Sequence, residues 1–302
     1  MGLDPNGIRF LLYSQKRGID FEETAMIGRQ SLDLTKTELG NIFQAFGLSV
    51  DKNTIESFFR ENPGYAESIL AFLGAKKIHS FDISPYEGAT HLADLNHPIA
   101  SDLQNSYSVV LDGGSLEHVF NFPVAIKNCM DMLRVGGHYL GITPANNFMG
   151  HGFYQFSPEI FFSIFTPQNG FELVDLIAFE SKAGAAWYAV KKPEDVKGRV
   201  QLVNNSPVYL LVIAKKLANK KIFDTTPQQS DYLATWKEHS RDQNSEDTSG
   251  QASGKNALRE WAKRRLPFVV KQKIQRMIEG YGFDPRFYTP IDPTKDNPRS
   301  RQ

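Results

Sequence analysis

The sequence has little of what marks secreted or nucleic-acid-binding proteins. Cys129 is the single cysteine among 302 residues, so no internal disulfide is possible and a reducing compartment is the simplest setting. Thirty-four Lys and Arg balance thirty-four Asp and Glu, which argues against a globally basic protein that binds nucleic acid. No internal repeat is visible.

Long hydrophobic runs are also missing. The apolar stretch at residues 8–13 is too short for the core of a signal peptide and far shorter than the roughly 20 residues that span a bilayer. Asn6 stands where an N-myristoylation signal requires Ser or Thr. We therefore expect a cytoplasmic protein with no transmembrane segment.

The composition is otherwise that of a folded protein. Apolar residues make up 41% of the chain and charged residues 23%, and 22 Phe and 11 Tyr can supply a large core. At about 150 residues per domain, this length predicts one large domain, or one domain with an added lobe.

We expect three parts along the chain. Residues 1–22 indicate a loosely attached, partly helical N-terminal lead-in, residues 23–216 the main domain, and residues 217–302 a C-terminal extension. Within the extension, the polar composition of residues 239–255 predicts a disordered linker. Residues 256–279 predict a basic helix. This helix can contact an acidic partner, but we favour the alternative that its apolar face is docked on the protein and its cations are solvated.

Apolar runs alternate with amphipathic stretches in the main domain. Runs typical of strands occupy residues 25–27, 77–81, 89–93, 107–111 and 138–143, and this alternation predicts a mostly parallel sheet with helices on both faces.

Two later runs, at residues 171–179 and 208–214, have no helix between them. This predicts an antiparallel hairpin at one edge of the sheet. Residues 180–206 would then be an insertion before the last strand.

Ligands bind such sheets beyond the carboxyl ends of the strands. Asp82 follows the second predicted strand, where a carboxylate can accept hydrogen bonds from ribose hydroxyls; capping of its own turn is the alternative. Asp94 follows the third strand, where it can meet an adenine amino group or stabilise a turn.

Residues 107–147, with their Leu116-Glu117-His118 turn and the Leu-x-x-Gly-Gly motif that ends at Gly137, resemble the class I S-adenosylmethionine-dependent methyltransferases. Residues 169–176 resemble the Gly-Phe entry to that family's sixth strand. The resemblance implies a Rossmann-like seven-stranded sheet, mostly parallel with an antiparallel last strand. It also implies S-adenosylmethionine as cofactor and methyl transfer to an undetermined, small-molecule or saccharide-type acceptor.

The resemblance further implies which residues bind the cofactor. Asp82 matches the ribose-binding acid, Asp94 and Leu95 flank the adenine, and Asp112 and Gly113 run under the methionine part. The full set of cofactor-binding residues that we predict is Gly28, Arg29, Asp82, Ile83, Asp94, Leu95, Asp112 and Gly113.

The first strand departs from the family pattern, which has a turn rich in glycine so that the backbone can approach the cofactor. Here the turn is Gly28-Arg29-Gln30-Ser31. Arg29 can place a cation near the cofactor's carboxylate or occupy the cofactor's space. The missing glycines leave an inactive binding or scaffold protein of the same fold as the alternative. They weigh more heavily against an NAD-dependent enzyme, because pyrophosphate needs a glycine-rich turn.

The candidate catalytic residues are Glu117, His118 and His151. The resemblance places the first two on the catalytic face, and His151 lies in the loop at residues 146–156, which also holds four aromatics. With an unperturbed pKa near 6.5, His151 is suited to take a proton from a hydroxyl or amine; a packed lid is the alternative. No Cys pair or His-Glu-x-x-His spacing is present, so we expect no metal site.

Overall fold

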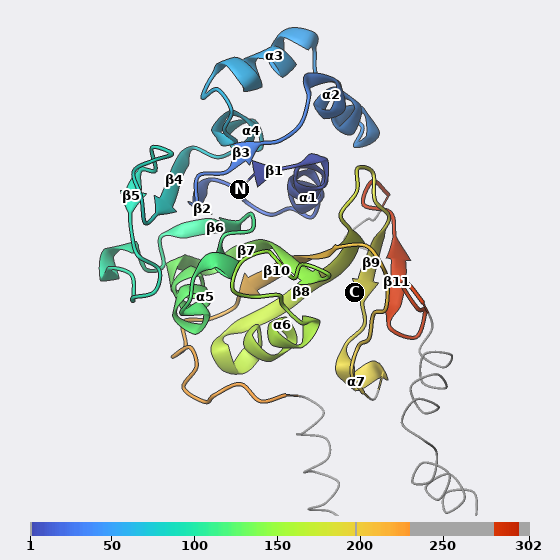
Figure 1. Ribbon diagram of the computed structural model, residues 1–302. Coiled ribbons are helices and arrows are strands. Elements are labelled where there is room, and N and C mark those ends of the chain that lie inside the picture. Colours follow the sequence, from blue (N-terminus) through green and yellow to red (C-terminus); the bar gives the residue numbers. More distant parts are fainter. Residues whose placement is uncertain (1, 197, 230–280, 296–302) are drawn as a thin grey trace, which may run out of the picture.

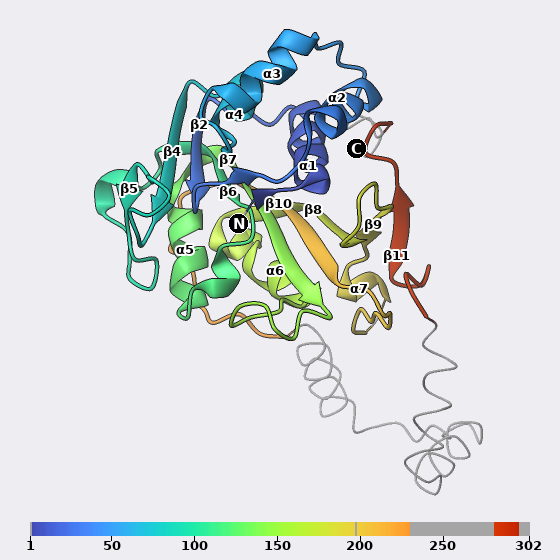
Figure 2. The ribbon, with the colours of Figure 1, turned by 45° about the horizontal axis from the view of Figure 1, so that its top comes forward.

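The computed structural model describes residues 2–196, 198–229 and 281–295. The linker expected at 239–255 and the basic helix expected at 256–279 lie outside the described residues. Within them, a large twisted sheet has helices on both faces (Figures 1 and 2).

The sheet has the topology that the sequence predicts for its main part. Its strand order is β11-β9-β8-β10-β7-β6-β2-β4-β5. The five strands from β5 to β7 are parallel, and β10 is antiparallel to both of its neighbours. The strands are β2 (Glu23–Ile27), β4 (Lys77–Asp82), β5 (His91–Leu92), β6 (Tyr107–Asp112), β7 (Leu133–Asn146), β8 (Phe171–Glu180), β9 (Trp187–Val190), β10 (Val208–Lys216) and β11 (Tyr288–Ile291).

All seven runs expected as strands are therefore strands, but the antiparallel pair of β8 and β10 is not at the sheet edge. The segment between these strands supplies β9, and the C-terminal part of the chain supplies β11. Both are antiparallel additions that continue the sheet beyond β8. The predicted number of strands in this sheet, seven, was too low because β9 and β11 have only four residues each. Such short strands carry little periodic signal.

Six helices cover the two faces. In Figure 1, α1 (Pro5–Lys16), α2 (Lys36–Ala45), α3 (Lys52–Arg60) and α4 (Glu67–Phe72) lie on one face, and α5 (Phe122–Met132) and α6 (Pro158–Ile164) on the other. Thr35 begins α2 with a capping box to Glu38, and Ser157 caps α6. The short helix α7 (Pro193–Val196) lies in the insertion, and β1 (Gly2–Leu3) pairs with β3 (Ser31–Leu32). No helix among the described residues is long and apolar enough to cross a membrane.

The N-terminal segment is not the loosely attached lead-in that the sequence suggested. Asp4 caps α1 by accepting a hydrogen bond from the Gly7 amide at 2.8 Å. Phe10 and Leu11 are fully buried in the core of that face, and the buried Tyr13 hydroxyl donates to Asp175 at 3.1 Å. The prediction failed because polar residues such as Asn6 and Ser14 share the buried face of α1 with its apolar residues, which weakens the periodic signal.

Candidate functional site

A cavity of about 250 Å³ lies beyond the carboxyl ends of β2, β4 and β5. Its volume is near the lower end of the range for small-ligand sites. Six of the eight predicted cofactor-binding residues line it, namely Gly28, Arg29, Asp82, Ile83, Asp94 and Leu95. The sheet thus brings together residues from three separate strand ends, as the sequence predicted.

Asp82 ends β4 and faces this cavity. One carboxylate oxygen, Oδ1, accepts a hydrogen bond from the Ser84 amide at 2.9 Å. None of the described residues donates to the other oxygen. Asp82 therefore caps its turn and still has a carboxylate oxygen left for a ligand hydroxyl, so the two interpretations from sequence are compatible.

Asp94 is more fully engaged with its own turn. Its Oδ1 accepts from the Asn96 amide at 3.0 Å, and its Oδ2 lies 3.1 Å from His97 Nδ1. The bonds from Asn96 and His97 lower the pKa of Asp94. Asn96 also lines the cavity and bonds Asn121, and sequence reasoning missed it because Asn is common in turns.

Arg29 forms one wall of the cavity but its charge is already paired. Its Nε donates to Glu67 at 2.6 Å and its guanidinium lies 3.9 Å from the centre of the Tyr65 ring. A second bond goes to the carbonyl of Glu87 at 2.9 Å. These contacts hold the guanidinium against α4.

Gln30 takes the place that the family's second glycine would have, and its side chain fills the space between the β2 turn and Gly113. Its Nε2 donates to the Ile27 carbonyl at 2.7 Å. Its Oε1 is buried and has no hydrogen-bond partner among the described residues. A Cβ added to Gly113 would lie only 2.0 Å from Oε1. The resemblance assigns this space to the methionine part of the cofactor, so Gln30 is the residue that most affects binding there.

Asp112 holds the turn after β6 and lines neither cavity. The fully buried carboxylate accepts bonds from the Ser115 amide at 2.8 Å and the Tyr139 hydroxyl at 3.0 Å. Burial raises the pKa of Asp112 to about 6. Its neighbour Gly113 does line a cavity, but the second one rather than the one bordered by Asp82.

A second cavity, of about 290 Å³, borders the same turn. Gly113, Glu117 and His151 line it, and so do Gly2 and Asp4 from the N-terminal segment. Sequence reasoning missed the last two, because only the packing of α1 brings the start of the chain over the sheet.

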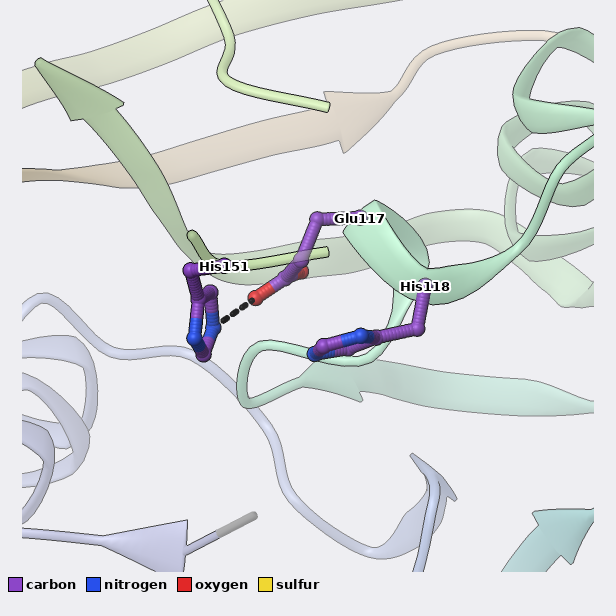
Figure 3. A group of neighbouring side chains, drawn as sticks. All are labelled: Glu117, His118 and His151. Atoms are coloured by element: carbon purple, nitrogen blue, oxygen red, sulfur yellow. Dashed lines mark ion pairs between the residues drawn. The ribbon is translucent and has the colours of Figure 1, made fainter. Parts of the chain in front are cut away.

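The three candidate catalytic side chains meet at this turn (Figure 3). Glu117 and His118 lie in a short 3-10 helix, and His151 lies in the loop after β7. His151 Nε2 is 3.3 Å from Glu117 Oε1, and the rings of His118 and His151 are 5.0 Å apart between centroids. The Phe153 amide donates to the Glu117 carbonyl at 2.8 Å, which ties the loop to the turn.

The electrostatics of this group are unusual. The Glu117 side chain is 0% exposed, and neither carboxylate oxygen has a hydrogen-bond partner among the described residues. Burial, together with the nearby Asp112 carboxylate, raises the pKa of Glu117 to about 8. Burial and the neighbouring His151 lower the pKa of His118. Perturbed groups beside a cavity are typical of functional sites.

The strand order is the observation that decides the architecture. Five parallel strands run from β5 through β4, β2 and β6 to β7, and β10 enters antiparallel between β7 and β8. The sheet thus has the Rossmann-like, mostly parallel fold with an antiparallel strand that the sequence resemblance implies. In that fold the first cavity lies beside β2, where the strand order reverses and where ligands of open α/β sheets bind.

Solved structures with a similar fold share little sequence with this chain. An inferred S-adenosylmethionine-dependent methyltransferase from Listeria monocytogenes is 14% identical over 69% of this chain and 99% of its own, with a TM-score of 0.36. An S-adenosylmethionine-dependent methyltransferase from Aquifex aeolicus is 8% identical over 70% and 98%, with a TM-score of 0.34. The C9 mutein of the branched-chain polyamine synthase from Thermus thermophilus, solved with N4-aminopropylspermidine and 5'-methylthioadenosine, is 12% identical over 74% of this chain and 59% of its own, with a TM-score of 0.37.

No family model and no curated protein sequence matches the chain. Structural similarity at these low scores says nothing about its reaction or ligand. Function is therefore inferred from the chain's own residues.

Proposed function

We propose that this protein is an S-adenosylmethionine-dependent methyltransferase that acts on a small-molecule or saccharide-type acceptor. The observation that supports this most is the pair of cavities on either side of the turn after β6. One is bordered by Asp82 and Asp94, and the other by Glu117 and His151. Methyl transfer needs such an arrangement, with a cofactor pocket and an acceptor pocket that share a boundary.

In this proposal the first cavity holds the adenosine part of the cofactor. Asp82 would accept hydrogen bonds from ribose hydroxyls, and Leu95 with Ile83 would contact the adenine. The cofactor supplies the chemistry, because its sulfonium is already an activated methyl donor. The chain's own residues need only bind and align the two reactants.

The second cavity would receive the acceptor. The methyl carbon bonds to the acceptor oxygen or nitrogen, its bond to sulfur breaks, and sulfur keeps the electron pair. His151 would take the proton that the acceptor loses, and Glu117 Oε1, 3.3 Å from its Nε2, would orient the ring.

Gln30 favours one alternative, a catalytically inactive protein of the same fold that binds or scaffolds a partner. Its side chain occupies the space that a glycine turn leaves open for the cofactor. If that side chain cannot move, the cofactor's methionine part has no room and only the architecture of the enzyme is kept.

Calorimetric titration and thermal melting with S-adenosylhomocysteine distinguish the two. By mass action, ligand at 100 times its dissociation constant stabilises the fold by about 2.7 kcal/mol, so we expect a raised melting temperature. The Asp82→Ala variant should lose at least about tenfold in affinity, since hydrogen bonds to a charged group contribute about 1.5–3 kcal/mol. The matched control is Asp102→Ala, at an exposed carboxylate in the loop before β6.

Two outcomes contradict the proposal. If the protein shows no binding but the Gln30→Gly variant binds, Gln30 blocks the site and the inactive alternative holds. If Asp82→Ala binds as tightly as the unchanged protein, the first cavity is not the cofactor site.

A further inference from the structure

The group formed by Glu117, His118 and His151 has the donor atoms of a metal site. One carboxylate oxygen and one ring nitrogen from each histidine lie within 4.8 Å of one another. Figure 3 shows the three side chains directed toward a common space from the turn and the facing loop. A first-row divalent cation with bonds of about 2.1 Å holds its ligands about 3–3.5 Å apart, and the Glu117 and His151 atoms already have this spacing at 3.3 Å.

Glu117 gives independent evidence for a missing partner. Its carboxylate is completely buried, yet neither oxygen accepts a hydrogen bond within the described part of the chain. His151 Nε2 lies 3.3 Å from one of these oxygens. Because a buried carboxylate without partners is costly, a cation bound between the three side chains would remove an unfavourable feature of the fold.

The surroundings favour a positive ligand. Asp4 and Asp33 line the second cavity together with Glu117, and no Lys or Arg side chain lines it among the described residues. The Asp112 carboxylate lies close enough to influence Glu117. The negative potential of these groups would concentrate cations in the cavity.

We propose that Glu117, His118 and His151 bind one divalent transition-metal cation, of the zinc or manganese type, at the boundary between the two cavities. Two imidazoles and one carboxylate form a donor set that suits Zn²⁺, Fe²⁺, Co²⁺ or Mn²⁺ better than Mg²⁺ or Ca²⁺. The sequence alone predicted no metal site, because the ligands come from two segments and match no common spacing.

Three protein ligands leave coordination positions open. His118 lines the first cavity, and Glu117 and His151 line the second, so an open position faces the space between them. A hydroxyl oxygen of the acceptor would bind there and become easier to deprotonate. This role rests on the proposed function; the binding of the cation does not. With the cation bound, His151 would act as a ligand and would not be the base.

The direct test is metal binding by the full-length protein after treatment with a chelator. In calorimetric titrations we expect Zn²⁺ or Mn²⁺ to bind at one equivalent with micromolar affinity, and Mg²⁺ at least 100-fold more weakly. Co²⁺ should give visible absorption bands that report its coordination by nitrogen and oxygen.

Variants identify the ligands. Glu117→Gln keeps the volume of the side chain and should weaken binding of Zn²⁺ at least 100-fold, as should His151→Ala. His97→Ala removes an exposed histidine that lines neither cavity and should bind like the unchanged protein. Circular dichroism of each variant confirms that it is folded.

The proposal is overturned if no one-equivalent binding occurs up to 1 mM metal, or if Glu117→Gln binds as tightly as the unchanged protein. A parallel titration with S-adenosylhomocysteine in the presence of chelator separates the two proposals. Cofactor binding without metal binding contradicts only the metal site, and metal binding without cofactor binding contradicts only the methyltransferase function.

Discussion

Gln30 and Gly113 form the tightest contact at the site, and they are coupled. Gln30 stands where a glycine turn would leave space, and its Oε1 would lie 2.0 Å from a Cβ at residue 113. A side chain at 113 would therefore force the Gln30 side chain to move. Gln30, which replaces a glycine-rich turn, therefore limits the space for a side chain at the end of β6.

The Gly113→Ala variant should therefore be destabilised by about 1–3 kcal/mol, the usual cost of an overpacked buried site. The double variant Gln30→Ala with Gly113→Ala should recover most of this loss, because the clashing atoms are gone. Urea unfolding of the two single variants and the double variant checks the coupling. If the losses of unfolding free energy in the two single variants simply add in the double variant, the two residues are not coupled.

Asp112 predicts a pH dependence of stability. Burial raises the pKa of Asp112 in the folded protein to about 6, above the ordinary aspartate value of 3.8. The fold therefore favours the neutral carboxyl. The stabilisation from that form is present below about pH 4 and is lost as the pH rises through 6. Asp112→Asn has no such titration. The unfolding free energy of the unchanged protein, relative to the variant, should fall by up to about 3 kcal/mol between pH 4 and pH 7.

Denaturant unfolding at several pH values measures this difference. The comparison with the Asn variant removes the contribution of groups that Asp112 does not influence, such as His138, whose pKa is lowered by burial to about 4. A difference that stays constant from pH 4 to pH 7 would show that Asp112 keeps an ordinary pKa in the fold.

At the scale of elements, the N-terminal helix α1 is part of the main domain. Its apolar face packs on the sheet together with α2 and α4, and Arg9 lies over the Trp187 ring of β9 at 4.9 Å from its centroid. The segment before it supplies Gly2 and Asp4 to the second cavity. The packing of α1 therefore positions one wall of the proposed acceptor site.

Leu11→Ala tests this packing. Leu11 is 0% exposed, and truncation of a buried leucine costs about 2–5 kcal/mol, so the melting temperature should fall clearly. Lys16→Ala, at an exposed position of the same helix, should change the unfolding free energy by no more than about 0.5 kcal/mol. If both variants lower the unfolding free energy equally and only slightly, residues 1–22 are a loosely attached lead-in after all.

At the scale of the whole molecule, the C-terminal part of the described chain contacts both β9 and the end of α1. β11 pairs with β9, and Lys16 in α1 bonds the carbonyl of Thr294. The Phe283 and Tyr188 rings are stacked with centroids 4.0 Å apart. The C-terminal part of the chain thus protects an edge that β9 would otherwise expose.

Tyr288→Ala measures how much the pairing of β11 with β9 stabilises the protein. Tyr288 is buried in β11 beside the Phe283 ring, and loss of a buried aromatic side chain costs about 3–5 kcal/mol. Thr289→Ala, exposed on the same strand, is the matched control. If both variants melt like the unchanged protein, β11 is only weakly attached to the sheet.

The sequence by itself determined seven strands, their parallel or antiparallel sense, and the placement of Asp82, Asp94 and Leu95 at one cavity. These strands are β2, β4, β5, β6, β7, β8 and β10. These features follow from local patterns. The spacing of apolar residues identifies the strands, and the order of the strands along the chain indicates which strand ends lie at the same edge of the sheet. Tertiary structure alone decided that α1 and β11 belong to the domain, that Gln30 lies against Gly113, and that His151 meets Glu117. Such contacts join residues far apart in the chain, and their distances depend on packing rather than on any local spacing.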